Sequence, residues 1–121
     1  MKAAIAGFVL RCKNRQNTAN FYSHLGLTVE DEHQHDCGPM HFSLKPTIEE
    51  LAVEIYTASN SHPTDAFMLE VDSIEDVLAT VKNLGIEPKM PIKNIGIKFR
   101  FTYITDPDGR DVMLLQKIPA E

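Results

Sequence analysis

The sequence predicts an α+β fold in which two tandem β-α-β-β-β modules, residues 1–60 and residues 61–121, form one curved mixed sheet. We expect the helices on the convex side of this sheet and a ligand cleft on its concave side. One supporting observation is that the strand and helix patterns of the first half recur in the second at a shift of about 59 positions, without a gap. Another is a dense turn signal, Asp106-Pro107-Asp108-Gly109, between an aromatic-rich strand pattern and an apolar one. Together they predict a single domain, residues 1–121, built from two similar halves.

The first module begins with a strand pattern over residues 7–12, in which two different faces alternate. A polar segment over residues 14–17 can cap a helix over residues 18–25, and Gly26 ends that helix. The other expected strands cover residues 27–29, 40–44 and 51–56, with a polar loop over 31–38 and a turn over 45–47.

The second module repeats this order. Alternation over residues 66–71 predicts a strand, and Ser73 is placed to cap the helix that follows, which Gly85 ends. The apolar face of this helix consists of Ile74, Val77, Leu78 and Val81. A weak edge strand over residues 86–90, interrupted by Pro88, precedes strands over 99–104 and 112–116.

Composition excludes several classes of partner. A formal net charge of −5 and no basic stripe argue against nucleic acid or an anionic membrane as a partner. No apolar run approaches the length of a membrane span. Two cysteines are too few for a secreted disulfide scaffold, so we expect reduced thiols and a cytoplasmic location.

Two motifs resemble those of the glyoxalase/bleomycin-resistance/dioxygenase superfamily, also called vicinal oxygen chelate proteins. They are Ala19-Asn20-Phe21-Tyr22-Ser23-His24-Leu25-Gly26-Leu27, at the end of the first helix, and Thr105-Asp106-Pro107-Asp108-Gly109-Arg110, before the last strand. With the paired modules, the resemblance covers nearly the whole chain. The superfamily includes lyases, isomerases, dioxygenases, transferases and drug-sequestering proteins, so the resemblance implies a fold more than a function.

The resemblance also implies where a metal would be held. Metal-dependent members carry His, Gln or Glu ligands on the first and last strand of each half, and these positions fall on Gly7, Glu54, Ala66 and Met113. Only Glu54 can bind a hard cation, and one carboxylate does not make a divalent site. We therefore predict no cofactor and no metal at the family's usual site.

Alternation along the strands predicts which side chains face the cleft. The expected ligand-binding residues are Arg11, His41, Glu54, Tyr56, Met68, Glu70, Arg100 and Met113. His41 and Glu54 lie on adjacent strand patterns, so they can form a general base with its orienting group, two ligands of a relocated divalent metal, or a polar pair without a catalytic role. Arg100, which overlays His41 in the repeat, can bind an anionic ligand group or form a salt bridge with Glu70 or Glu54.

A second cluster, His33, His35 and Cys37, shares one side of an extended segment and offers nitrogen and sulfur ligands suited to zinc. It lacks the paired spacing of a structural zinc motif, so a solvated loop at the cleft mouth is the favoured interpretation.

The sequence is compatible with two functions and with a third, less favoured class of function. The favoured one is a metal-free protein that binds an unknown small molecule and forms a homodimer, as the drug-sequestering members of the superfamily do. The alternative is a lyase or isomerase of glyoxalase type that uses His41 and Glu54, either with a relocated divalent metal or by metal-free acid–base chemistry with His41 as the base. A structural or partner-binding module is the third.

Overall fold

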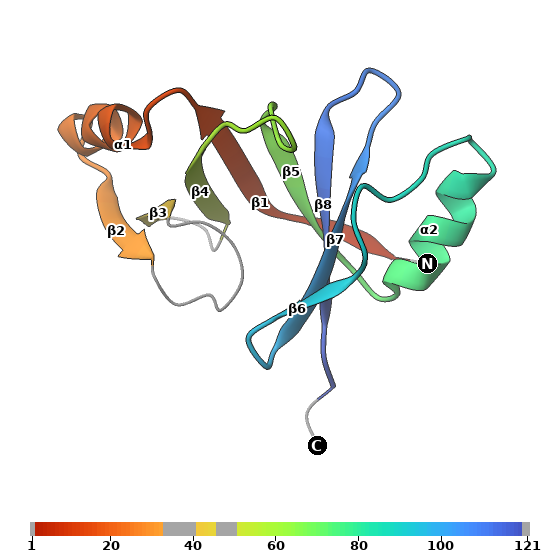
Figure 1. Cartoon of the computed structure of the whole chain (residues 1–121). Helices are drawn as coiled ribbons and strands as arrows, with labels where there is room; N and C mark the ends of the chain where they lie inside the picture. Colours follow the sequence, from red (N-terminus) through yellow and green to blue (C-terminus); the bar gives the residue numbers. More distant parts are fainter. Residues whose placement is uncertain (1, 33–40, 46–50, 120–121) are drawn as a thin grey trace.

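The computed structural model describes residues 2–32, 41–45 and 51–119 of the 121-residue chain. Its elements follow the predicted order (Figure 1). They are β1 (Ala3–Cys12), α1 (Arg15–His24), β2 (Thr28–Glu32), β3 (His41–Lys45), β4 (Ala52–Thr57), β5 (Ala66–Val71), α2 (Ile74–Lys82), β6 (Lys93–Ile95), β7 (Phe99–Thr105) and β8 (Asp111–Lys117).

All of these strands belong to one mixed sheet, in the order β2-β3-β4-β1-β5-β8-β7-β6. Each half contributes four neighbouring strands, and the halves join where β1 pairs antiparallel with β5. Within each half the first and last strands pair in parallel, β1 with β4 and β5 with β8. In Figure 1, α1 lies beside β2 at one end of the sheet and α2 lies at the other end. The predicted α+β class is confirmed.

The second helix begins directly after Ser73, as predicted, whereas the first begins at Arg15, three residues before its predicted start at residue 18, because Asn14 is the residue that caps it. The side chain of Asn14 accepts a hydrogen bond from the N–H of Asn17 (3.0 Å), and Ser73 accepts one from the N–H of Asp76 (3.1 Å). Gly26 and Gly85 follow the helices with positive φ angles of 97° and 80°, which glycine adopts without steric cost. These local signals confirm both caps.

The predicted turn between β7 and β8 is also confirmed. One carboxylate oxygen of Asp106, Oδ1, accepts hydrogen bonds from the N–H groups of Asp108 (2.9 Å) and Arg110 (3.0 Å). Gly109 completes the turn with a φ of 87°.

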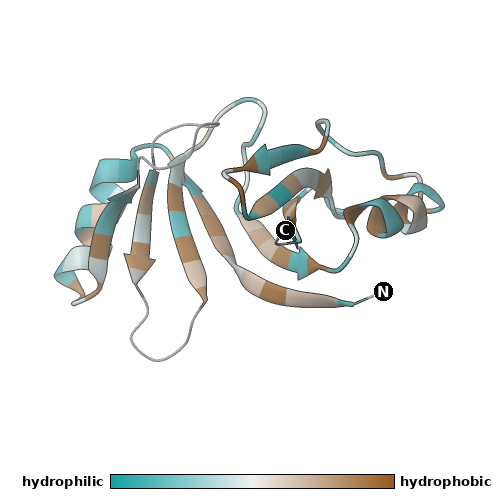
Figure 2. Ribbon diagram, turned by 90° about the horizontal axis from the view of Figure 1, so that it is seen from below, coloured by the Kyte–Doolittle hydropathy of each residue, from teal (hydrophilic) through white to brown (hydrophobic). Residues whose placement is uncertain are grey.

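Three apolar clusters hold the sheet and its helices together. One packs α1 against the sheet through Ala19, Leu44 and Ile55, and a second packs α2 through Val71, Ile74, Ile104 and Leu114. The third lies under the cleft and contains Val9, Ala66, Met68, Tyr103, Met113 and Leu115. Figure 2 shows the resulting alternation of hydrophobic and hydrophilic bands along the strands. None of the described helices is long and apolar enough to cross a membrane.

Two strand predictions are wrong in the second half. The edge strand expected over residues 86–90 lies instead at β6, because Pro88 and Pro91 remove backbone donors from the earlier segment. The expected faces of β7 are also exchanged. Thr102 pairs with Leu114 and Tyr103 with Met113, so the aromatic residues Phe99, Phe101 and Tyr103 face the cleft.

Candidate functional site

The concave side of the sheet encloses a cleft of about 1240 Å³, large enough for a drug-sized molecule. Its apolar wall comes mainly from the second half and includes Met68, Phe99, Phe101, Met113 and Leu115. Its polar groups come from both halves and from the link between them, and they include Arg11, Glu54, Tyr56, His62, Glu70, Lys89 and Tyr103. The site therefore has an apolar body and a separate polar region.

Most of the residues predicted to bind a ligand line this cleft. They are Arg11, Glu54, Tyr56, Met68, Glu70 and Met113. Position in the lining shows that a ligand can reach these side chains; their part in binding stays a prediction. Two predicted residues, His41 and Arg100, lie elsewhere.

His41 lies behind the cleft wall, against Glu54. Its Nε2 atom is 3.0 Å from Oε2 of Glu54, and its ring stacks on Tyr56 at 4.4 Å between centroids and 15° between planes. The His41 side chain is 1% exposed and that of Glu54 is 15% exposed. The carboxylate is therefore the member of the pair that meets the cleft, and the imidazole is placed to orient it.

The prediction that Arg100 faces the cleft is wrong. Its guanidinium donates two hydrogen bonds to Glu75 of α2, at 3.2 and 2.8 Å, on the helix-covered side of the sheet. The expected alternative partners, Glu54 and Glu70, are on the opposite face. The cause is the exchanged face of β7, since Arg100 and Phe101 are neighbours on one strand.

The four positions that carry metal ligands in the resemblance do not fit a divalent ion. A Cβ atom built on Gly7 would lie 2.0 Å from the carbonyl oxygen of Ala52, so no ligand side chain fits there without moving backbone. Ala66 and Met113 are buried in the apolar floor, which leaves Glu54. Within the described ranges, no three His, Cys, Asp or Glu side chains gather as a metal site would require. The His33, His35 and Cys37 cluster lies outside the described residues.

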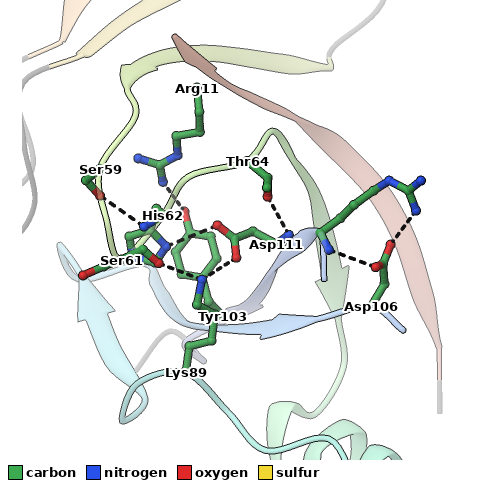
Figure 3. Close-up of polar contacts among 10 residues, drawn as sticks. Arg11, Ser59, Ser61, His62, Thr64, Lys89, Tyr103, Asp106 and Asp111 are labelled. Atoms are coloured by element: carbon green, nitrogen blue, oxygen red, sulfur yellow. Dashed lines mark hydrogen bonds and ion pairs between the residues drawn. The ribbon is translucent and has the colours of Figure 1, made fainter. Parts of the chain in front are cut away.

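The link between the two halves closes one end of the cleft with a polar cluster that the sequence did not predict (Figure 3). Asp111, only 1% exposed, accepts a hydrogen bond from Nζ of Lys89 at 2.5 Å. Lys89 also donates to the carbonyl oxygen of Ser61 at 2.7 Å. Nδ1 of His62 is 3.5 Å from Oδ2 of Asp111, within ion-pair distance, but both atoms are buried without a hydrogen bond. The cluster thus anchors the link to β8 and leaves polar atoms unsatisfied.

Arg11 and Tyr103 extend this cluster into the cleft. Nη2 of Arg11 donates to the Tyr103 hydroxyl at 3.2 Å, and the His62 ring packs on the Tyr103 ring at 4.4 Å between centroids. Burial, then the positive charges of Arg11 and Lys89, lower the pKa of His62 below 6.5 against the opposing effect of Asp111. Burial raises the pKa of Tyr103 above 10.0, although Arg11 opposes it. Both groups are therefore neutral at pH 7.

Sequence signals for this end of the cleft were weak. Asp111 lies on the same face of β8 as Met113, but His62 lies in a segment without strand or helix periodicity, and Lys89 lies in the segment where an edge strand was expected. Tyr103 faces the cleft because the faces of β7 are exchanged relative to the expectation that Arg100 faces it. The position of Tyr103 in the cleft depends on the register of β7 against β8, which pairs Tyr103 with Met113.

A profile of the Glyoxalase/Bleomycin resistance protein/Dioxygenase superfamily matches residues 4–114. The chain belongs to this superfamily. No curated protein matches the sequence significantly.

Solved structures share the superfamily fold at low sequence identity. Methylmalonyl-CoA epimerase from Mycobacterium tuberculosis superposes with a TM-score of 0.69 at 12% identity, covering 95% of this chain and 88% of the epimerase. A variant of glyoxalase I from Zea mays gives 0.73 at 14% identity, covering 96% of this chain and 43% of that protein. A superfamily member from Vibrio splendidus gives 0.65 at 16% identity, covering 95% and 99%. At these identities the likeness establishes the fold alone.

Proposed function

We propose that this superfamily member binds a small molecule in its concave cleft and does so without the usual metal of the superfamily. The observation that carries the proposal is a cleft of about 1240 Å³ in which three of the four inherited ligand positions are Gly7, Ala66 and Met113. An apolar wall with a few polar groups at one end is the common form of a small-molecule site.

The neutral dye Nile red tests for binding in the cleft. We expect saturable binding with a blue-shifted emission, weakened at least several-fold in Phe101→Ala, because Phe101 lines the cleft. Phe8→Ala is the matched control, since Phe8 lies on the opposite face of the sheet. Equal affinity of the wild type and Phe101→Ala would contradict binding in this cleft.

Elemental analysis of protein purified without chelator tests the second part of the proposal. We expect less than stoichiometric divalent metal. Stoichiometric zinc, nickel, manganese or iron that is lost in Glu54→Gln would replace this proposal with a relocated metal at His41 and Glu54.

A second candidate, a lyase or isomerase of glyoxalase type, is favoured by the His41–Glu54 pair. A carboxylate that faces a cleft and is held by a buried imidazole can abstract a proton next to a carbonyl. Here Glu54 is the base and His41 the positioning residue. Turnover of a thiohemiacetal or an acyl thioester that is unchanged in Glu54→Gln would exclude it.

We also propose a homodimer, in the cytoplasm. Its support is an apolar patch on the convex side, where Ile5 is 54%, Phe8 36% and Phe67 46% exposed and the two phenylalanine rings are 5.2 Å apart. A second copy of the chain would bury this patch by twofold symmetry. Light scattering after gel filtration should give a dimer for the wild type and a monomer for Phe67→Asp. Leu84→Asp, on an exposed residue beyond α2, is the control and should remain dimeric.

A further inference from the structure

Among the described residues, the positive charge of Arg11 has no counter-charge. Arg100 is paired with Glu75, and Arg110 with Asp106 and Asp108. Across the described part of the chain, no carboxylate lies within ion-pair distance of the Arg11 guanidinium, which is nevertheless partly buried in the cleft wall. A buried charge is costly unless it is paired, so this position favours a negatively charged ligand group.

The guanidinium is also held in place. The ring of Tyr56 lies 4.5 Å from its central carbon, and the hydroxyl of Tyr103 accepts from Nη2 at 3.2 Å. The backbone N–H of Arg11 donates to Asp65 at 2.9 Å, which fixes the end of β1. Nε is buried without a hydrogen-bond partner. The guanidinium is thus fixed on two sides, and among the described residues its Nη1 atom makes no hydrogen bond, so an oxygen of an acid group can accept from it.

The acidic groups in and beside the cleft contact partners other than Arg11. Asp111 is neutralised by Lys89, and Glu54 is in contact with His41. Glu70 lies toward the far end of β5, with Nζ of Lys117 at 3.9 Å. At this end of the cleft, Arg11 is therefore the cation that has no ion-pair partner among the described residues, and the floor of the cleft is apolar.

We propose that Arg11 binds the acid group of an amphipathic organic anion, whose apolar body lies against Met68, Phe101 and Met113. This inference rests on the proposed function and names the ligand class: a carboxylate or chemically similar oxyanion at one end, an aromatic or aliphatic body at the other. Cationic ligands of similar shape are disfavoured by Arg11.

A matched series of fluorescent probes tests the charge requirement: pyrenebutanoate, its neutral amide and the corresponding pyrenebutylamine. With the wild-type protein, pyrenebutanoate should bind at least about tenfold more tightly than the amide, and the amine should bind most weakly. Arg11→Gln should remove this preference and leave the affinity for the amide unchanged. Arg100→Gln is the matched control, because it removes an arginine from the opposite face, and it should retain the wild-type order.

A second readout reports the place of binding. Arg11 is one of the charges that lower the pKa of His62, so an anion bound at Arg11 should raise that pKa and the neutral amide should not. The described groups that face His62 are Arg11, Lys89, Tyr103 and Asp111. Lys89 and Asp111 form an ion pair with each other, whereas Arg11 has no ion-pair partner among the described residues. Proton NMR of the imidazole measures the shift, and Arg11→Lys should retain it with weaker binding.

The outcomes separate the two proposals. Equal affinities for acid and amide, or a preference for the acid that persists in Arg11→Gln, would overturn the inference while leaving the cleft a binding site. Nile red binding with no binding of any pyrene probe would overturn it as well. Failure of both Nile red and the pyrene series would overturn the proposed function, and the inference with it.

Discussion

The two halves of the sheet agree in their paired central strands and differ in the strand next to them. Gly7 pairs with Ala52 and Val9 with Glu54, just as Ala66 pairs with Asp111 and Met68 with Met113 at the same shift along the chain. The neighbouring strands, β3 and β7, do not keep this correspondence. Phe42 of β3 pairs with Ile55, and the counterpart of Ile55 in the second half is Leu114. Leu114 pairs with Thr102. The halves thus differ by one residue in the register of β3 and β7.

The length of one connection explains this difference. Residues 46–51 separate β3 from β4, but only residues 106–110 separate β7 from β8. Since side chains alternate along a strand, a connection shorter by one residue exchanges the faces of the strand before it. In the first half, Ser43 therefore lies on the same face of the sheet as Glu54, and His41 lies behind Glu54, outside the cleft lining. In the second half, Phe99, Phe101 and Tyr103 line the cleft.

The largest expected effect distinguishes two equivalent positions, Gly7 and Ala66. Gly7→Ala would place a Cβ atom 2.0 Å from the carbonyl oxygen of Ala52, and backbone must move to make room. We expect the free energy of unfolding to fall by about 3 kcal/mol or more. Ala66→Gly should cost only about 1 kcal/mol, through backbone entropy and a lost methyl contact. Urea denaturation measures both; equal losses would show that the two halves tolerate side chains alike at this position.

The register of β7 is tested by Ile104, which packs against α2 with Ile74 and Leu114. Ile104→Ala should reduce the free energy of unfolding by about 2–4 kcal/mol, because it leaves a cavity under the helix. Arg100→Gln on the same strand removes a half-exposed ion pair with Glu75 and should cost less than about 1 kcal/mol, decreasing with salt. If Ile104→Ala instead weakened Nile red binding at little cost in stability, β7 would present the opposite face.

The helix caps should behave alike in the two halves. Asn14→Ala and Ser73→Ala each remove an acceptor for a backbone N–H in the first helical turn. We expect each to lower the free energy of unfolding by about 1 kcal/mol. Ser73→Asn, which keeps an acceptor, should lie within about 0.5 kcal/mol of the wild type in thermal or urea denaturation. A cap whose removal has no effect would indicate that packing alone defines that helix start.

The smallest expected effect concerns His62, the histidine of the polar cluster at the end of the cleft. Its pKa should lie below 6.5 and should rise in Arg11→Gln, which removes one of the charges that lower it. Because the folded state binds the proton less readily than the unfolded state, stability should decrease as the pH falls from about 6.5 through the folded pKa. Imidazole NMR titration of the wild type and His62→Asn, with denaturation at both ends of this range, checks the sign. A folded pKa above 6.5 would reverse it.

Local patterns predicted much of the fold because they depend on neighbouring residues. Ser73 and Gly85 bound α2, and the Asp106–Gly109 turn joins β7 to β8, through hydrogen bonds and φ angles within a few residues. The inward faces of β1, β4, β5 and β8 also follow from alternation, which placed Arg11, Glu54 and Met68 in the cleft. The orientation of Arg100 could not be predicted in this way, because it depends on pairing with another strand.

By itself, the sequence determined the order of the elements, their caps and the turn before β8. Only the tertiary structure decided which groups meet at the end of the cleft. Arg11, His62, Lys89, Tyr103 and Asp111 come from five separate segments and meet through strand pairing and the path of the link. The physical reason is the separation in sequence of the residues that interact. Caps and turns form between near neighbours, whereas a one-residue change in a connection alters which side chains share a face only once the strands have paired.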